Sequence, residues 1–210
     1  QNILHDINIT GVSMNSKLIN EGNIFVAIKG LRSDGHDFID QAINSGASAI
    51  VTNGCDLGPL SVPQIEVDDT RKALSAIAAE YYGRPSNDLV VIGITGTNGK
   101  TTTAALTKAI LDSAGHKTAQ IGTLGLIADG IDHEKTMTTP DAISIQKTLH
   151  NLREKDFTHV VMEVSSHALD QNRVADIDFK IAAFTNLTPE HLDYHSTIEN
   201  YFRSKMKLFK

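Results

Sequence analysis

The chain has 210 residues, 40% of them hydrophobic, which is enough to bury the core of one large domain or two small ones. Its formal net charge of −6 argues against nucleic acid as a partner, and no apolar run approaches the roughly 20 residues of a membrane span. The single cysteine, Cys55, excludes an internal disulfide and is typical of a reducing compartment. We therefore expect a cytoplasmic protein that binds neither nucleic acid nor membrane, and we assign Cys55 no function.

The first part of the chain combines strand and helix patterns. Apolar, β-branched runs predict strands at 24–28 and 49–51, and His36 to Ser45 is predicted to form a helix closed by Gly46. A second helix is predicted for 71–82. The Gly/Pro/Ser/Asn-rich stretch 82–88 then marks a boundary, so we expect one domain at 1–84 and a second at 85–210.

The second part alternates apolar strands with helices that are predicted at 101–114, 141–154 and 197–209. This alternation predicts right-handed βαβ units and a mainly parallel sheet. The expected fold class is α/β: a small N-terminal α/β domain, followed by a P-loop-type, mainly parallel sheet with flanking helices.

The strongest single motif is a glycine-rich turn between a buried strand and a helix, in the stretch 90–102. Glycines allow backbone N–H groups to surround an anion, the helix N-terminus adds positive potential, and a lysine reaches the outer phosphates. The general pattern expects glycine where Ile94 stands, so the motif is the shorter G-T-N-G-K-T. We predict a site for ATP or GTP formed by Gly96, Thr97, Asn98, Gly99, Lys100, Thr101 and Thr102.

Three predicted strands end in polar residues that are able to do chemistry. They are 89–95, which enters the glycine-rich turn, 159–162, which precedes Glu163, and 181–184, which precedes Thr185 and Asn186. Ligands of open α/β sheets bind at the carboxyl ends of the strands, so these groups should meet at one edge. Glu163 would then face a Mg²⁺ ion held by the Thr101 hydroxyl; the alternative is a capping or edge carboxylate.

Two histidines, His191 and His195, are four residues apart and could share a helical face. A zinc site is weakly supported, because no third histidine or cysteine ligand is close in sequence. A histidine near phosphate-bound Mg²⁺ is the better functional interpretation, and we favour His191 because it is nearer the strand end. The alternative is a capping or solvent-facing histidine.

Lys205 lies at the centre of the apolar face of the last predicted helix. Tyr201, Phe202, Leu208 and Phe209 stand at −4, −3, +3 and +4 from it. Burial would lower the pKa of this lysine and leave a reactive neutral amine. A lysine that packs its stem and extends its charge into water has the same spacing, so the pattern alone does not decide.

Taken together, these motifs resemble the Mur ligases of bacterial cell-wall synthesis. The resemblance covers nearly the whole chain and is carried by G-T-N-G-K-T, the E-V-S-S-H run, N-L-T-x-x-H-L-D-Y-H and Y-F-x-S-K-x-x-L-F. The runs at 137–140 and 165–174 look specific to the branch that adds the third amino acid of the cell-wall peptide.

The resemblance implies an ATP-dependent ligase of peptidoglycan synthesis. It would add a diamino acid, meso-diaminopimelate or L-lysine, to UDP-MurNAc-L-Ala-D-Glu through an acyl phosphate. Lys100, His191 and Lys205 would be catalytic. Thr101 and Glu163 would serve one Mg²⁺ ion, and His191 together with a CO₂-derived carbamate on Lys205 would serve a second.

By the same resemblance, the UDP-MurNAc dipeptide would be held in two places. The second-domain residues are Thr138, Thr139, Ser165, Gln171 and Arg173, and the first-domain residues are Met14, Ser16, Leu31, Arg32 and Ser33. The family usually has Asp-Ser-Arg where this chain has Asn15-Ser16-Lys17, which weakens any argument from a planar guanidinium there.

Family members continue through the rest of the central sheet into a third domain that binds the incoming amino acid. We therefore expect this chain to be either an inactive fragment of a monomeric enzyme or a truncated homologue, and we favour the fragment because the central sheet looks unfinished. One alternative is a catalytically silent nucleotide- or UDP-sugar-binding homologue, against which Glu163, His191 and Lys205 argue. Another is a folylpolyglutamate synthetase-like ligase, against which the first domain and the Thr-Thr-Pro run argue. A GTPase is less favoured because no Asn-Lys-x-Asp motif occurs.

Overall fold

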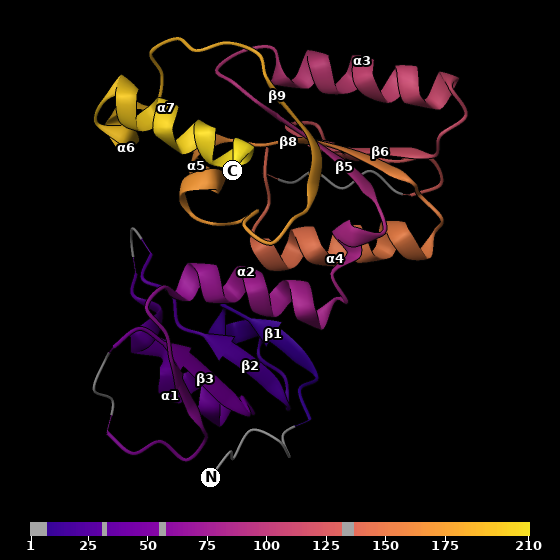
Figure 1. Cartoon of the computed structure of the whole chain (residues 1–210). Coiled ribbons are helices and arrows are strands. Elements are labelled where there is room, and N and C mark those ends of the chain that lie inside the picture. The colour runs from indigo at the N-terminus through magenta and orange to yellow at the C-terminus, as the bar shows by residue number, and fades with distance from the viewer. Residues whose placement is uncertain (1–7, 31–32, 55–57, 132–136) are drawn as a thin grey trace. The chain divides into compact units, whose positions relative to one another are not determined.

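The computed structural model of the chain describes residues 8–30, 33–54, 58–131 and 137–210, which form two compact units that divide between Tyr81 and Tyr82 (Figure 1). Each unit combines a largely parallel sheet with helices, so the predicted α/β class is confirmed. The division lies close to the domain boundary that the sequence suggested at residue 84. Among the described residues, no helix combines the length and the apolar character that crossing a membrane requires.

The first unit is built on a four-stranded parallel sheet in the order β1-β2-β3-β4. Its strands are β1 (Gly11–Ser13), β2 (Asn23–Val26), β3 (Ala49–Thr52) and β4 (Gln64–Glu66), and its helices are η2 (Ser16–Leu18), η3 (Gly35–Phe38), α1 (Ile39–Asn44) and α2 (Thr70–Tyr81). The core joins Phe25 and Ile50 of the sheet to Ile39 and Ala42 of α1. The single helix predicted at 36–45 is therefore two pieces. The first is a 3₁₀ turn that starts where the Asp34 carboxylate accepts the His36 N–H.

The second unit has a five-stranded sheet in the order β7-β6-β8-β5-β9, in which only β7 is antiparallel to its neighbour. Its strands are β5 (Val90–Thr95), β6 (Thr118–Gly122), β7 (Gly125–Ile127), β8 (His159–Glu163) and β9 (Phe179–Phe184). Its helices are η4 (Pro85–Asn87), α3 (Lys100–Ser113), α4 (Ala142–Glu154), α5 (Ser166–Asp170), α6 (Leu192–His195), α7 (Ile198–Met206) and η5 (Lys207–Phe209).

Helices α3 and α4 cover opposite faces of this sheet (Figure 1). On one face, Ile145, Leu149 and Leu152 of α4 pack into the main core of the unit. On the other face, Ala104 of α3 packs against a smaller cluster that includes Ile94. The covered faces explain why β5 and β8 are apolar on both sides, as strands of parallel sheets usually are.

The register of the sheet confirms that the three polar strand ends meet at one edge. Strand β5 lies between β8 and β9, with Ile94 opposite Glu163 and Thr95 opposite Phe184. The residues that follow each strand are therefore neighbours in space.

The last predicted helix differs from the structure in its length and in one of its faces. The α-helix ends at Met206 and continues as η5, and it buries Tyr201, Lys205 and Leu208. Phe202 and Phe209 are expected on the apolar face around Lys205, but each is 42% exposed, so they lie at the edge of that face. Their rings instead lie near Phe184 of β9, at the rim of the described sheet, where solvent reaches them.

Candidate functional site

The glycine-rich turn has the backbone that the sequence predicts for an anion-binding loop. It leads from β5 into α3 and contains Gly96 and Gly99, both with positive φ, at 140° and 85°. A Cβ atom at Gly96 would lie 1.9 Å from Oγ1 of Thr185. This position therefore requires glycine both for its conformation and for the close approach of β9.

The end of β9 fixes the shape of this loop. The Asn186 carbonyl accepts the Thr97 N–H at 2.9 Å, and the Asn186 side chain accepts the Asn98 N–H at 3.0 Å. The Thr185 hydroxyl donates to the Asn98 carbonyl at 2.7 Å. Because three bonds from one strand end hold the turn, the loop is preorganised before any ligand arrives.

Lys100 begins α3 and folds back over the loop. Its ammonium donates to the carbonyls of Gly96 and Thr97 at 2.9 and 2.8 Å. Partial burial lowers the pKa of Lys100, while the carboxylates of Glu163 and Glu190 act in the opposite direction. This amine lies where it can exchange backbone carbonyls for the oxygens of a phosphate.

Glu163 ends β8 and is completely buried, beside the first turn of α3. Its Oε2 accepts the Thr101 hydroxyl at 2.9 Å, so the carboxylate and the hydroxyl predicted to share a Mg²⁺ ion are in contact. Magnesium sites commonly use one or two protein oxygens and several waters, and this pair fits such a site. The described residues contain no cluster of three or more His, Cys, Asp or Glu placed to hold a metal.

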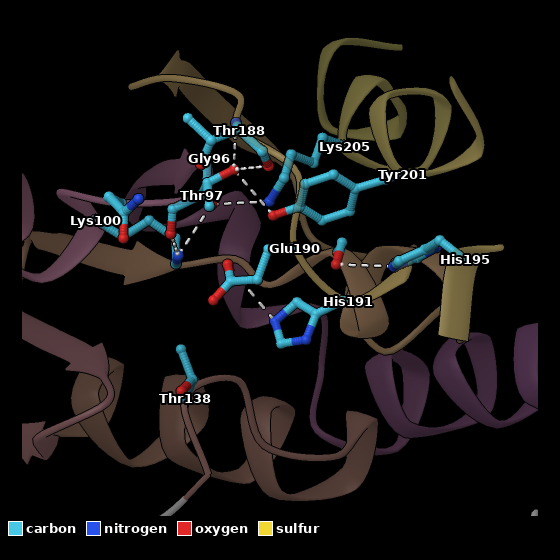
Figure 2. Close-up of polar contacts among 12 residues, drawn as sticks. Gly96, Thr97, Lys100, Thr138, Thr188, Glu190, His191, His195, Tyr201 and Lys205 are labelled. Carbon is cyan, nitrogen blue, oxygen red and sulfur yellow. Dashed lines mark hydrogen bonds and ion pairs between the residues drawn. The ribbon is translucent and has the colours of Figure 1, made fainter. Parts of the chain in front are cut away.

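Lys205 reaches the same loop from α7 and is only 1% exposed. Its ammonium donates to the Gly96 carbonyl at 2.8 Å and lies 4.4 Å from the centre of the Tyr201 ring (Figure 2). Burial, and then the nearby charge of Lys100, lower the pKa of Lys205 to about 8. As a charged amine it cannot ligate Mg²⁺, whereas an oxygen-bearing derivative of the same side chain could.

The two histidines have different surroundings. His191 is 45% exposed, and its Nε2 lies 3.8 Å from a carboxylate oxygen of Glu190 (Figure 2). His195 is buried, with its ring nitrogens 3.0 Å from the Ser166 hydroxyl and 3.4 Å from that of Ser204. Burial lowers the pKa of His195. Of the two, His191 has the ring that is open to a ligand.

The predicted acceptor-binding residues of this unit form a connected group. The Arg173 guanidinium donates to the Thr139 carbonyl at 2.9 Å and to Oε1 of Gln171 at 2.8 Å. The hydroxyl of the buried Thr139 donates to the Glu163 carbonyl at 2.9 Å, and Ser165 caps α5. Thr138 is partly exposed. Thr102 is exposed on the first turn of α3, and no contact of its side chain defines a role.

In the first unit, Met14, Ser16 and Ser33 line one pocket of about 450 Å³. Its other lining residues are Asn15, Lys17, Phe25, Ile28, Gly30, Gly35, Phe38 and Arg71. Ser16 is largely buried, and its hydroxyl donates to Gln41 at 2.8 Å. Leu31, Arg32 and Cys55 lie outside the described residues, so their predicted roles remain predictions.

Sequence reasoning missed two residues of the second unit. Glu190 stands inside the recognised run at 186–195, and its charge partly opposes the lowering of the pKa values of Lys100 and Lys205 that burial causes. Thr123 lies between β6 and β7 and contacts Glu163 through both its backbone and its hydroxyl. Because neither strand is predicted from the sequence, no sequence pattern places Thr123 at this edge.

The profile of the Mur ligase middle domain matches residues 94–210, more than half of the chain. The chain belongs to the Mur ligase family. A second profile, described as the catalytic domain of the Mur ligase family, matches residues 8–82. The two Mur ligase profiles thus cover both compact units.

A UDP-N-acetylmuramoyl-L-alanyl-D-glutamate–2,6-diaminopimelate ligase of Syntrophomonas wolfei is 47% identical over 206 residues, which are 98% of this chain and 42% of that protein. A solved structure of a ligase with the same name superimposes with a TM-score of 0.84 at 30% identity, covering 96% of this chain and 41% of the other. A MurF ligase of Thermotoga maritima in complex with ADP superimposes with a TM-score of 0.59 at 26% identity, covering 98% of this chain and 44% of the other. This Mur ligase chain spans about two fifths of the length of these relatives.

Proposed function

We propose that this chain forms the UDP-binding and ATP-binding domains of a cytoplasmic, monomeric ligase of peptidoglycan synthesis. The ligase would join a diamino acid to UDP-MurNAc-L-Ala-D-Glu at the expense of ATP. The observation that carries the proposal is the meeting of the 96–100 loop, Glu163 and Lys205 at one sheet edge. The names of the relatives favour 2,6-diaminopimelate over L-lysine as the added amino acid.

The chemical problem is to bring an anionic carboxylate of the acceptor against an anionic γ-phosphate. The 96–102 loop would hold the phosphates with its backbone N–H groups, and Lys100 would move from the carbonyls of Gly96 and Thr97 to the outer phosphates. Phosphorylation of the acceptor would give an acyl phosphate and ADP. The amine of the diamino acid would then attack the acyl carbon, forming the amide and releasing phosphate.

Two Mg²⁺ ions would supply charge neutralisation at the transferring phosphoryl group. Thr101 and Glu163 would hold one of them, which fits the contact between their oxygens. His191 would hold the other together with Lys205, provided that the lysine is carbamylated.

The burial of Lys205 favours that modification. With a pKa of about 8, roughly a quarter of its amine is neutral at pH 7.5. The neutral nitrogen forms a bond to the carbon of CO₂ and releases a proton, which converts a cation into a carboxylate-like anion. The new group could no longer donate from an ammonium to the Gly96 carbonyl, and its oxygens could ligate a metal.

The acceptor would be held by both units. Its uridine diphosphate would occupy the pocket lined by Met14, Ser16 and Ser33, with Leu31 and Arg32 close in sequence. Its peptide would lie near Thr138, Thr139, Ser165, Gln171 and Arg173. The cationic Arg173 is suited to an anionic group of the acceptor.

The direct test is turnover by the full-length protein that carries this chain. ATP, Mg²⁺ and UDP-MurNAc-L-Ala-D-Glu would be supplied with meso-diaminopimelate, L-lysine or other amino acids, and phosphate release and the amide product would be measured. One diamino acid should yield the product. Nucleotide binding without turnover of any amino acid would instead support a silent binding homologue, and turnover of a folate substrate would support the folylpolyglutamate synthetase-like alternative.

A further inference from the structure

Thr123 contacts both oxygens of the Glu163 carboxylate. It lies in the turn between β6 and β7, where its backbone N–H donates to Oε1 at 3.0 Å and its hydroxyl donates to Oε2 at 3.2 Å. Oε2 also accepts the Thr101 hydroxyl. Thr123 therefore helps to fix the direction in which this buried carboxylate faces the first turn of α3.

The same hydroxyl also lies 3.1 Å from Oγ1 of Thr138. A threonine hydroxyl has one proton to donate and two lone pairs to accept with. Because Thr123 donates its proton to Glu163, Thr138 is the donor in the contact between the two threonines. The result is a directed chain of hydrogen bonds from Thr138 through Thr123 to Glu163.

Two neighbouring residues, Gly122 and Thr139, help to hold Glu163 in the position that this chain of hydrogen bonds requires. A Cβ atom at Gly122 would stand 2.1 Å from Oε1 of Glu163, so only glycine lets the turn come this close. On the other side, Thr139 donates its hydroxyl to the backbone carbonyl of Glu163 at 2.9 Å. The adjacent residues Thr138 and Thr139 thus reach Glu163 by separate routes, one through its side chain and one through its backbone.

We propose that Thr123 is a positioning residue that couples acceptor binding at Thr138 to the Thr101–Glu163 pair beside the nucleotide loop. The inference rests on the proposed function, which places the acceptor at Thr138. An acceptor group that hydrogen-bonds to Thr138 alters the hydrogen bond between Thr138 and Thr123. The altered Thr123 hydroxyl in turn changes how the Glu163 carboxylate is held. The reverse also holds, because coupling between two binding sites is reciprocal.

We expect Thr123 to affect ligand binding more than it affects the folding stability of the unliganded protein. Thr123 is exposed when no ligand is present, so water competes for its hydroxyl. A bound acceptor and nucleotide exclude that water, and the hydrogen bonds of the chain then strengthen one another.

The test measures acceptor binding by calorimetry in the full-length protein, with and without a non-hydrolysable ATP analogue and Mg²⁺. The ratio of the two dissociation constants is the coupling factor. Thr123→Val removes the hydroxyl but keeps the backbone N–H, and should move this factor toward one by about tenfold, the effect of one hydrogen bond. Thr123→Ser should keep the wild-type factor. Thr158→Val, at an exposed threonine immediately before β8, is the matched control.

A second route does not depend on Thr123→Val folding well. Thr138→Val should lose the same coupling, and combining it with Thr123→Val should add nothing further, because both variants break one chain. A wild-type coupling factor in Thr123→Val or in Thr138→Val would overturn the inference, as would loss of coupling in Thr123→Ser with its fold intact. If the wild-type protein neither binds this acceptor nor turns it over, the proposed function itself fails, and that result is distinct from these.

Discussion

Replacing Lys205 with methionine should stabilise the second unit at neutral pH, because the site disfavours the charge that the wild-type amine carries. Lys205 is 1% exposed, and burial followed by the charge of Lys100 lowers its pKa to about 8, against 10.5 for an ordinary lysine. Between pH 8 and pH 10.5, the lysine binds a proton in the unfolded state but has largely lost it in the folded state. The free energy of unfolding of the wild type should therefore rise with pH across this window, by at most about 3 kcal/mol in total.

The destabilisation that comes from burying the charged Lys205 amine is fully present below pH 8. It is absent above about pH 10.5, where the lysine is neutral in both the folded and the unfolded state. Methionine has no charge to bury, but it loses the hydrogen bond to Gly96, which contributes about 1 kcal/mol. Lys205→Met should thus exceed the wild type by about 2 kcal/mol at pH 7, and this advantage should disappear, and then reverse, toward pH 10.

The measurement is urea unfolding of the 210-residue chain in CO₂-free buffer, followed through methyl NMR signals of β5 and β8. Lys147→Met, an exposed lysine on α4, is the matched control and should show no such pH dependence relative to the wild type. A difference between Lys205→Met and the wild type that stays flat from pH 7 to 10 would refute the reasoning. Addition of ¹³C-bicarbonate should then give a carbamate signal in the wild type that Lys205→Met lacks.

Three further predictions concern the loop, the carboxylate and the first unit. Lys100→Ala in the full-length protein should lower the proposed ligase turnover by about 100-fold or more while leaving the fold intact by circular dichroism, and near-normal turnover would contradict its phosphate role. Gly122→Ala should displace Glu163, destabilise the protein by about 1–3 kcal/mol and raise the Mg²⁺ concentration needed for turnover. Gly115→Ala, which is strained by its positive φ but points into open space, should leave the Mg²⁺ requirement unchanged. UDP added to the chain should shift the amide NMR signals of Met14, Ser16 and Ser33, and Ser16→Ala should weaken that binding about tenfold; unshifted signals would remove the uridine site from this pocket.

The sequence predicted well those features that depend on local pattern. The β-branched run before Gly96 marks a strand buried on both faces, and the glycines after it mark a turn with positive φ. The spacing of Tyr201 and Leu208 placed Lys205 on the apolar face of its helix, and both of these neighbours are buried, whereas Phe202 and Phe209 are at the rim. Each of these signals is contained within about ten residues of chain.

The features that the sequence did not predict depend on pairing between distant segments. Strand β6 reads Thr-Ala-Gln-Ile-Gly and has few β-branched residues, so its place beside β8 follows from packing and not from propensity. Without β6, the contact of Thr123 with Glu163 cannot be foreseen. The choice between a snorkelling and a buried Lys205 also required the position of α7 relative to Gly96, which no local pattern contains.

The ring of Tyr201 gives this site an optical reporter. The chain contains no tryptophan and four tyrosines, and Tyr201 is the fully buried one. Its hydroxyl is 3.1 Å from that of Thr97 in the glycine-rich loop, and its face lies beside the Lys205 ammonium. Tyrosine absorbance and emission respond to hydrogen bonding and to a nearby charge. Filling of the loop, or a change in the charge of Lys205, therefore alters the ultraviolet spectrum of the unlabelled protein.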